Sequence, residues 1–169
     1  MHKIILGLSL LFISACGVKQ TQSMLNSGDY DGAIDRAVEG LRTNKNSKSN
    51  QDYVYLLEES FAKAKERDEA SIQLLIKENN SSNYERIYDL YKQLMKRQEK
   101  IKPLLPLKLL KENRNAIFPF KDYTDELLAS KTNFTSYLYQ KDQNCPEVSF
   151  QMTKTDFFKY FNHEIVSYV

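Results

Sequence analysis

The chain has 169 residues, the length of one domain, and its 41% hydrophobic and 27% charged residues are ordinary for a protein that folds around a core. The 24 Lys and Arg residues nearly balance the 22 Asp and Glu residues, so no bulk charge points to nucleic acid as a partner. Two cysteines and two histidines are too few for a disulfide scaffold and argue against a zinc site of the usual Cys and His kind.

The first 15 residues predict a signal peptide. Lys3 supplies the positive charge, and an uninterrupted run of apolar and small residues follows at 4–15. This run is shorter than the roughly 20 residues that a helix needs to cross a bilayer. We therefore expect residues 1–15 to be a signal sequence rather than a membrane-spanning anchor.

The apolar run ends in Ile13-Ser14-Ala15-Cys16. This sequence resembles the lipobox of bacterial lipoproteins, in which an aliphatic residue and two small residues precede a cysteine. The resemblance implies cleavage between Ala15 and Cys16, a diacylglycerol on the Cys16 thiol, and an acyl chain such as palmitate on its new amino group. Several acyl chains hold a protein on a membrane, whereas a single chain binds reversibly.

Two other interpretations of Cys16 are a chance cysteine in a secretory signal and a buried thiol in an N-terminal helix. Its position directly after the small residues favours lipidation. Gly17 stands where lipoproteins retained in the inner membrane carry Asp, and residues 17–20 lack the acidic cluster of surface-exported lipoproteins. The resemblance thus implies an outer-membrane protein facing the periplasm, with residues 16–23 as a lipidated flexible tether.

A helical domain is expected over residues 24–102. Within 26–45, small and apolar residues have the spacing G-x-Y-x-x-A-I followed by a leucine; they are Gly28, Tyr30, Ala33, Ile34 and Leu41. Asp29 is placed to cap the helix. This segment resembles the second helix of a tetratricopeptide repeat (TPR), which implies helical hairpins that bind a protein or peptide. Gly40 and Lys45 depart from the repeat, which has a small Ala and often a Pro at these positions.

The periodicity predicts a long helix over 50–78, where apolar residues recur at steps of three and four, and a polar turn at 79–83. Asp68 interrupts the apolar stripe. We interpret it as a snorkelling or bundle-end polar residue rather than a functional carboxylate.

Residues 84–102 predict the most regular helix, which Pro103 ends. Tyr84, Tyr88 and Tyr91 follow one face, and two interpretations stay open: a partner-binding surface, or simple helix packing with the hydroxyls at the rim. Packing is the commoner outcome. The same helix carries a basic run that we expect to be a solvated face; it consists of Lys92, Lys96, Arg97, Lys100 and Lys102.

Residues 103–169 are expected to form a less regular, aromatic-rich C-terminal part, because three prolines interrupt any helix near 103–119. The apolar segment 104–110 is predicted to dock on the preceding helices. Further on, the pattern allows a helix over 123–140, a short strand over 147–152 and a final helix over 155–168. The expected fold class is all-α, an antiparallel helical bundle with TPR-like hairpins.

No catalytic or metal-binding motif is present in the sequence. Cys145 and His163 are the remaining thiol and imidazole after the signal. Cys145 is interpreted as a semi-buried small residue, with an intermolecular disulfide or a reactive thiol as the alternative, and His163 as a surface or rim residue of the last helix. We expect no cofactor other than the lipid on Cys16.

The whole chain resembles small outer-membrane lipoproteins with TPR-like helices, such as those common in Bacteroidota. The favoured function is therefore a lipid-anchored, non-catalytic module that binds or scaffolds an envelope protein or peptide. One alternative is a small envelope enzyme, such as a cell-wall hydrolase, that uses His163, Asp125 or Glu126. The other alternative is a truncated relative without function.

Overall fold

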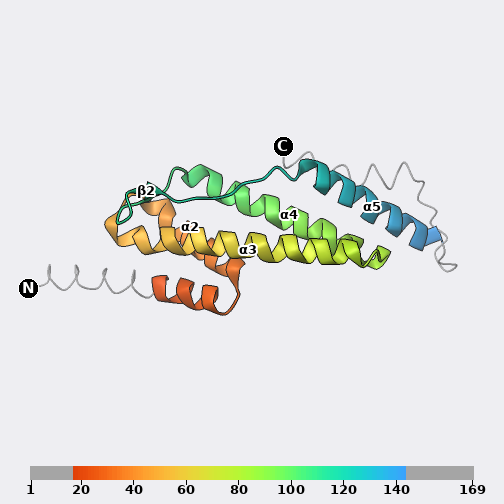
Figure 1. The fold of residues 1–169 in the computed structure, drawn as a ribbon, viewed down its shortest axis with the longest axis horizontal. Helices are drawn as coiled ribbons and strands as arrows, with labels where there is room; N and C mark the ends of the chain where they lie inside the picture. Colours follow the sequence, from red (N-terminus) through yellow and green to blue (C-terminus); the bar gives the residue numbers. More distant parts are fainter. Residues whose placement is uncertain (1–16, 144–169) are drawn as a thin grey trace, which may run out of the picture. The chain divides into compact units, whose positions relative to one another are not determined.

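The computed structural model describes residues 17–143 of the chain, with side chains up to residue 141 (Figure 1). Its elements are a helix at 17–26, α2 (Tyr30–Thr43), η1 (Lys48–Asn50), α3 (Gln51–Lys77), η2 (Ser81–Asn83), α4 (Tyr84–Ile101), η3 (Lys102–Leu104), β1 (Lys108–Leu109), β2 (Arg114–Asn115) and α5 (Thr124–Gln143). The predicted all-α class is confirmed, with α2, α3 and α4 reversing direction in turn (Figure 1).

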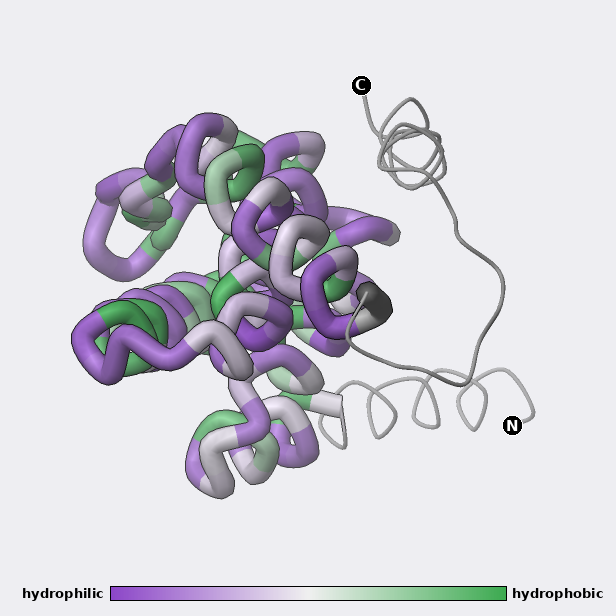
Figure 2. The backbone as a smooth tube through the Cα atoms, turned by 90° about the vertical axis from the view of Figure 1, so that its right-hand side faces the viewer, coloured by the Kyte–Doolittle hydropathy of each residue, from purple (hydrophilic) through white to green (hydrophobic). Residues whose placement is uncertain are grey.

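The chain divides into two compact units. Unit 1 comprises the residues up to Ser71 together with Gln93–Asp122, and unit 2 comprises Ile72–Lys92 together with the residues from Tyr123 on. Helices α3 and α4 each contribute residues to both units. In Figure 2, hydrophobic and hydrophilic stretches alternate along the helices, as amphipathic helices require.

The helix ends follow the local sequence. Gly28 adopts a positive φ of 83°, which glycine tolerates, and closes the turn after the helix at 17–26. Asp29 then caps α2 as predicted, because its Oδ1 accepts a hydrogen bond from the Gly32 N–H at 3.0 Å. The predicted helices over 50–78 and 84–102 are observed as α3 and α4, and the helix over 123–140 as α5. The resemblance of α2 to a tetratricopeptide repeat stays a prediction.

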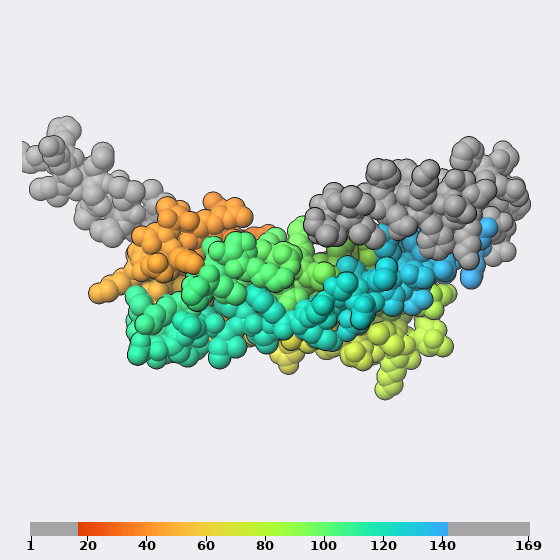
Figure 3. Space-filling model, turned by 90° about the horizontal axis from the view of Figure 1, so that it is seen from above, coloured from red at the N-terminus to blue at the C-terminus, as the bar shows by residue number. Residues whose placement is uncertain are grey.

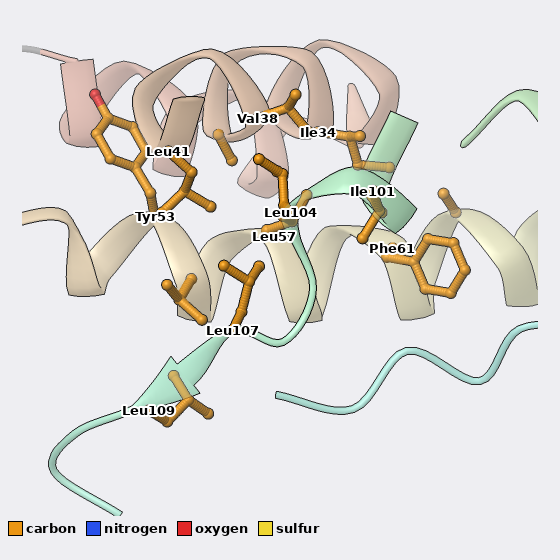
Figure 4. Packing of buried hydrophobic residues seen from close by; sticks show 13 residues of the cluster. Ile34, Val38, Leu41, Tyr53, Leu57, Phe61, Ile101, Leu104, Leu107 and Leu109 are labelled. Carbon is orange, nitrogen blue, oxygen red and sulfur yellow. The ribbon is translucent and has the colours of Figure 1, made fainter. Parts of the chain in front are cut away.

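The core of unit 1 lies between α2, the first part of α3 and the segment after α4 (Figure 4). From α2 it takes the buried residues Ile34, Ala37, Val38 and Leu41. The predicted docking of 104–110 is confirmed, since Leu104, Leu107 and Leu109 are buried in this core. Phe61 of α3 also meets the rings of Phe118 and Phe120 edge-on, at centroid distances of 5.6 and 5.5 Å.

A hairpin of two short strands follows η3 in unit 1. Lys108 pairs with Asn115 and Leu109 with Arg114 in an antiparallel register. Arg114 holds the second strand to α3 with two hydrogen bonds to the Glu58 carboxylate, at 2.7 and 3.0 Å. These bonds above all, with the Ile117 N–H as a further donor, lower the pKa of Glu58.

Residues 17–23 are not the flexible tether that the sequence analysis predicts. They form most of the helix at 17–26, in which Thr21 is fully buried and Val18 packs against the core of unit 1. The polar composition of the segment concealed this, because only one side of the helix needs apolar or small residues to dock.

The predictions for two charged residues of unit 1 were also wrong. Asp68 is not a snorkelling or bundle-end residue, and Arg97 does not belong to a solvated face, because they are 1% and 2% exposed. Arg97 Nη2 lies 2.6 Å from Asp68 Oδ2, and its Nε donates to Asp31 Oδ1 at 2.6 Å. Arg67 Nε donates to the other Asp68 oxygen at 2.8 Å. Asp31, Arg67, Asp68 and Arg97 form an ion-pair cluster that joins α2, α3 and α4. The attraction between these charges compensates the cost of burying them.

Candidate partner-binding groove

Unit 2 contains a groove of about 340 Å³ bordered by the end of α3, the turn before η2, the start of α4 and α5. Its apolar lining consists of Leu75, Ile76, Tyr84, Ile87, Tyr91 and Ala129. Its polar lining consists of Asn79, Asn80, Glu126, Ser130 and Asn133. A concave apolar surface with a few polar groups is the usual chemistry of a binding site.

Local structure explains how these residues come to face one space. Ile87 and Tyr91 are four residues apart on α4 and therefore share a helix face. Glu126, Ala129, Ser130 and Asn133 follow one another by three, one and three residues, which places them on one face of α5. Asn79 lies in the turn two residues after the end of α3 and has a positive φ of 48°, a conformation that asparagine adopts more readily than most residues.

The three predicted tyrosines do not form one exposed surface. Tyr91 is buried, and its ring lies 6.0 Å from that of Tyr123. Tyr84 meets Tyr137 edge-on at 6.3 Å, and Tyr88 stacks on Phe134 at 6.1 Å. These contacts agree with the helix-packing interpretation. Tyr84 and Tyr91 also line the groove, whereas Tyr88 does not.

Tyr88 has a second contact that occupies its ring. The Lys92 ammonium lies 5.8 Å from the ring centroid, within the range of a cation–π interaction. With Phe134 stacked on it as well, Tyr88 is a packing residue of unit 2. Of the predicted set, the candidate groove therefore keeps Tyr84 and Tyr91.

The remaining lining residues were not predicted from the sequence. Their signal was present on α5, where the three- and four-residue spacing from Glu126 to Asn133 marks a mixed polar face. The spacing does not reveal which other helix packs opposite this face of α5. Asp125 lies beside Glu126 in the first turn of α5 but is exposed and does not line the groove.

Other predicted features lie outside the described residues. These are the cleavage site at Ala15, the lipidated Cys16, Cys145, His163, the strand over 147–152 and the helix over 155–168. Among the described residues, no group of three or more Asp, Glu, His or Cys side chains is placed to hold a metal ion. No helix in residues 17–143 has the length and apolarity to cross a bilayer.

Comparisons with protein-family models, with curated proteins and with solved structures found no match to this chain.

Proposed function

We propose that the protein is a lipid-anchored, non-catalytic helical module of the bacterial cell envelope that binds a peptide segment of another envelope protein. The observation that carries the binding part is the groove of unit 2, in which Tyr84 and Tyr91 stand among aliphatic residues. Its volume of about 340 Å³ accommodates a few side chains rather than a folded surface. The lipobox at Cys16 carries the anchoring part.

The groove favours a peptide with apolar side chains. Leu75, Ile76 and Ile87 provide apolar surface, and the amides of Asn79 and Asn133 provide donors and acceptors for a peptide backbone. Glu126 is the charged residue of the lining. Tyrosine adds a large, rigid contact surface at low entropic cost, which suits a binding residue.

Changing Cys16 to Ala is expected to abolish lipid labelling and to leave the signal uncleaved, because the thiol that receives the diacylglycerol is gone. The measurement is labelling of growing cells with palmitate, followed by separation of the inner and outer membranes. Cys145→Ala is the matched control and should be labelled and located like wild type. Equal labelling of wild type and Cys16→Ala would refute the anchor.

Filling the groove is expected to reduce partner binding. Ala129→Trp places an indole in the groove, whereas Leu128→Trp adds the same ring at the neighbouring, exposed position that does not line it. A photo-crosslinking amino acid at Asn80 reports occupancy in living cells. We expect the crosslinked product to fall at least roughly tenfold in Ala129→Trp, the effect of losing a central interface contact.

The control Leu128→Trp should crosslink as wild type does. Equal crosslinking by both tryptophan variants would show that the groove is not the binding site. If Asp125→Asn abolished the protein's function in the cell but left crosslinking unchanged, the envelope-enzyme alternative would be favoured instead, because Asp125 lies outside the groove.

A further inference from the structure

The helix at 17–26 leaves no slack between the proposed lipid and the folded protein. Gly17 directly follows Cys16 in the sequence, is buried, and belongs to this helix. Val18, the next residue, packs against the core of unit 1. The inference rests on the proposed lipid on Cys16. With that lipid, the acyl chains are attached one residue before Gly17, which is held in place on unit 1.

That fixed point lies at one end of unit 1. Gly17 is so close to α3 that a Cβ atom on it would be 2.1 Å from the Tyr53 hydroxyl. Tyr53 lies two residues after Gln51, the first residue of α3. The side-chain oxygen of Gln51 accepts a hydrogen bond from the Leu110 N–H of the hairpin at 2.8 Å. The hairpin and the turn before α3 are found at this same end (Figures 1 and 3). A membrane holding acyl chains at this end would face the hairpin.

The side chains at this end suit an anionic membrane surface. The elements at this end carry four exposed lysines that form no ion pair within residues 17–143: Lys19 near the start of the helix at 17–26, Lys48 before α3, and Lys108 and Lys111 on the hairpin. Leu110, between two of them on the hairpin, is 41% exposed. Asp52 is an exposed acid at the same end, and Glu112 shares the single charge of Arg114 with Glu58, so these acids offset part of the lysine charge.

We propose that this end of unit 1 is a membrane-contact surface, in which the four lysines bind anionic phospholipid headgroups and Leu110 enters the interfacial region. Basic residues within a Debye length of an anionic leaflet are attracted to it, and a leucine adds apolar contact. A lipid anchor without a tether then fixes the orientation of unit 1 as well as its location.

Tryptophan fluorescence tests this surface, because the chain contains no Trp. Leu110→Trp places the probe on the hairpin. Glu66→Trp is the matched control at an exposed position of α3, 66 − 51 = 15 residues from its start, which at 1.5 Å per residue is about 22 Å along the helix. Each purified, acyl-labelled protein is placed in vesicles of phosphatidylethanolamine and phosphatidylglycerol that contain lipids brominated on their acyl chains.

Bromine quenches a tryptophan that enters the bilayer. We expect the probe of Leu110→Trp to be quenched roughly threefold more than the probe of Glu66→Trp. This difference should shrink when Lys48, Lys108 and Lys111 are changed to Glu, or when neutral phosphatidylcholine replaces the anionic lipid. Equal quenching of the two probes in labelled protein would overturn the contact surface and leave the lipid anchor standing. Absence of the acyl label would remove the anchor, and the contact surface with it.

Discussion

Replacing Arg97 by Met is expected to lower the free energy of unfolding by about 3 kcal/mol, because it leaves the buried Asp68 carboxylate with one of its two cationic partners. Met keeps much of the aliphatic volume of the arginine side chain, so the loss reports the charge rather than a cavity. Arg67, which is 42% exposed along its side chain, still pairs with Asp68 and keeps the loss at the lower end of the range for a broken buried pair. Urea unfolding followed by circular dichroism measures it.

Two further variants make the result specific. Arg42→Met removes the exposed ion pair with Glu39 and should cost no more than about 0.5 kcal/mol. The double variant Asp68→Leu with Arg97→Leu removes both buried charges, and it should be more stable than Arg97→Met alone. A loss in Arg97→Met as small as that in Arg42→Met would mean that the cluster contributes little to stability.

The same cluster makes stability depend on pH in the acid range. Burial raises the pKa of Asp31, but the hydrogen bonds and charges of Arg97 and Arg67 outweigh this and bring the pKa below its ordinary value of 3.8. A lowered carboxylate pKa adds stability that is fully present above pH 3.8 and is lost as the pH falls through the lower, folded-state value. In Arg97→Met, this acid-sensitive component should be smaller than in wild type.

The cluster also shows where sequence reasoning stops. Hydrophobic periodicity predicted α3 and α4 closely, because each carries a long amphipathic pattern that ends in a turn or a proline. It misread Asp68 and Arg97, each of which looks like a surface charge on its own helix. Only the packing of α3 against α4 brings the two charges together and makes their burial tolerable.

The candidate groove was predictable in part for a similar reason. Tyr84 and Tyr91 stand out on a regular helix, and the sequence left two interpretations open for them, a partner-binding surface and the commoner helix packing. Whether a partner or another helix of the same chain covers a tyrosine stripe depends on where α5 packs, and the rings of Tyr123 and Tyr137 settle that only in three dimensions. The prediction of a flexible tether before residue 24 was wrong for a different reason, since few strongly apolar residues mark the side on which the helix at 17–26 docks.

Gly40→Ala is expected to destabilise the protein by about 1–2 kcal/mol, although helix propensity alone predicts a gain of about 1 kcal/mol. A Cβ atom at Gly40 of α2 would lie 2.7–2.9 Å from three carbons of the Tyr53 ring. The ring rises from α3 beside Leu41 in Figure 4, it is buried, and its hydroxyl lies against Gly17, so its surroundings oppose a shift away from the new methyl group. This contact explains why position 40 holds glycine.

The background Tyr53→Ala provides the control, since it removes the ring that the new methyl group would meet. In that background Gly40→Ala should become stabilising, by up to the roughly 1 kcal/mol of its helix propensity. The reversal of sign, measured as a double-mutant cycle from urea midpoints, isolates the contact between the two positions from any effect on α2 alone. A stabilising Gly40→Ala in the wild-type background would show that the Tyr53 ring moves freely. The helix at 17–26 would then be held less tightly than the burial of Gly17 indicates, and with it the fixed point on which the membrane-contact surface depends.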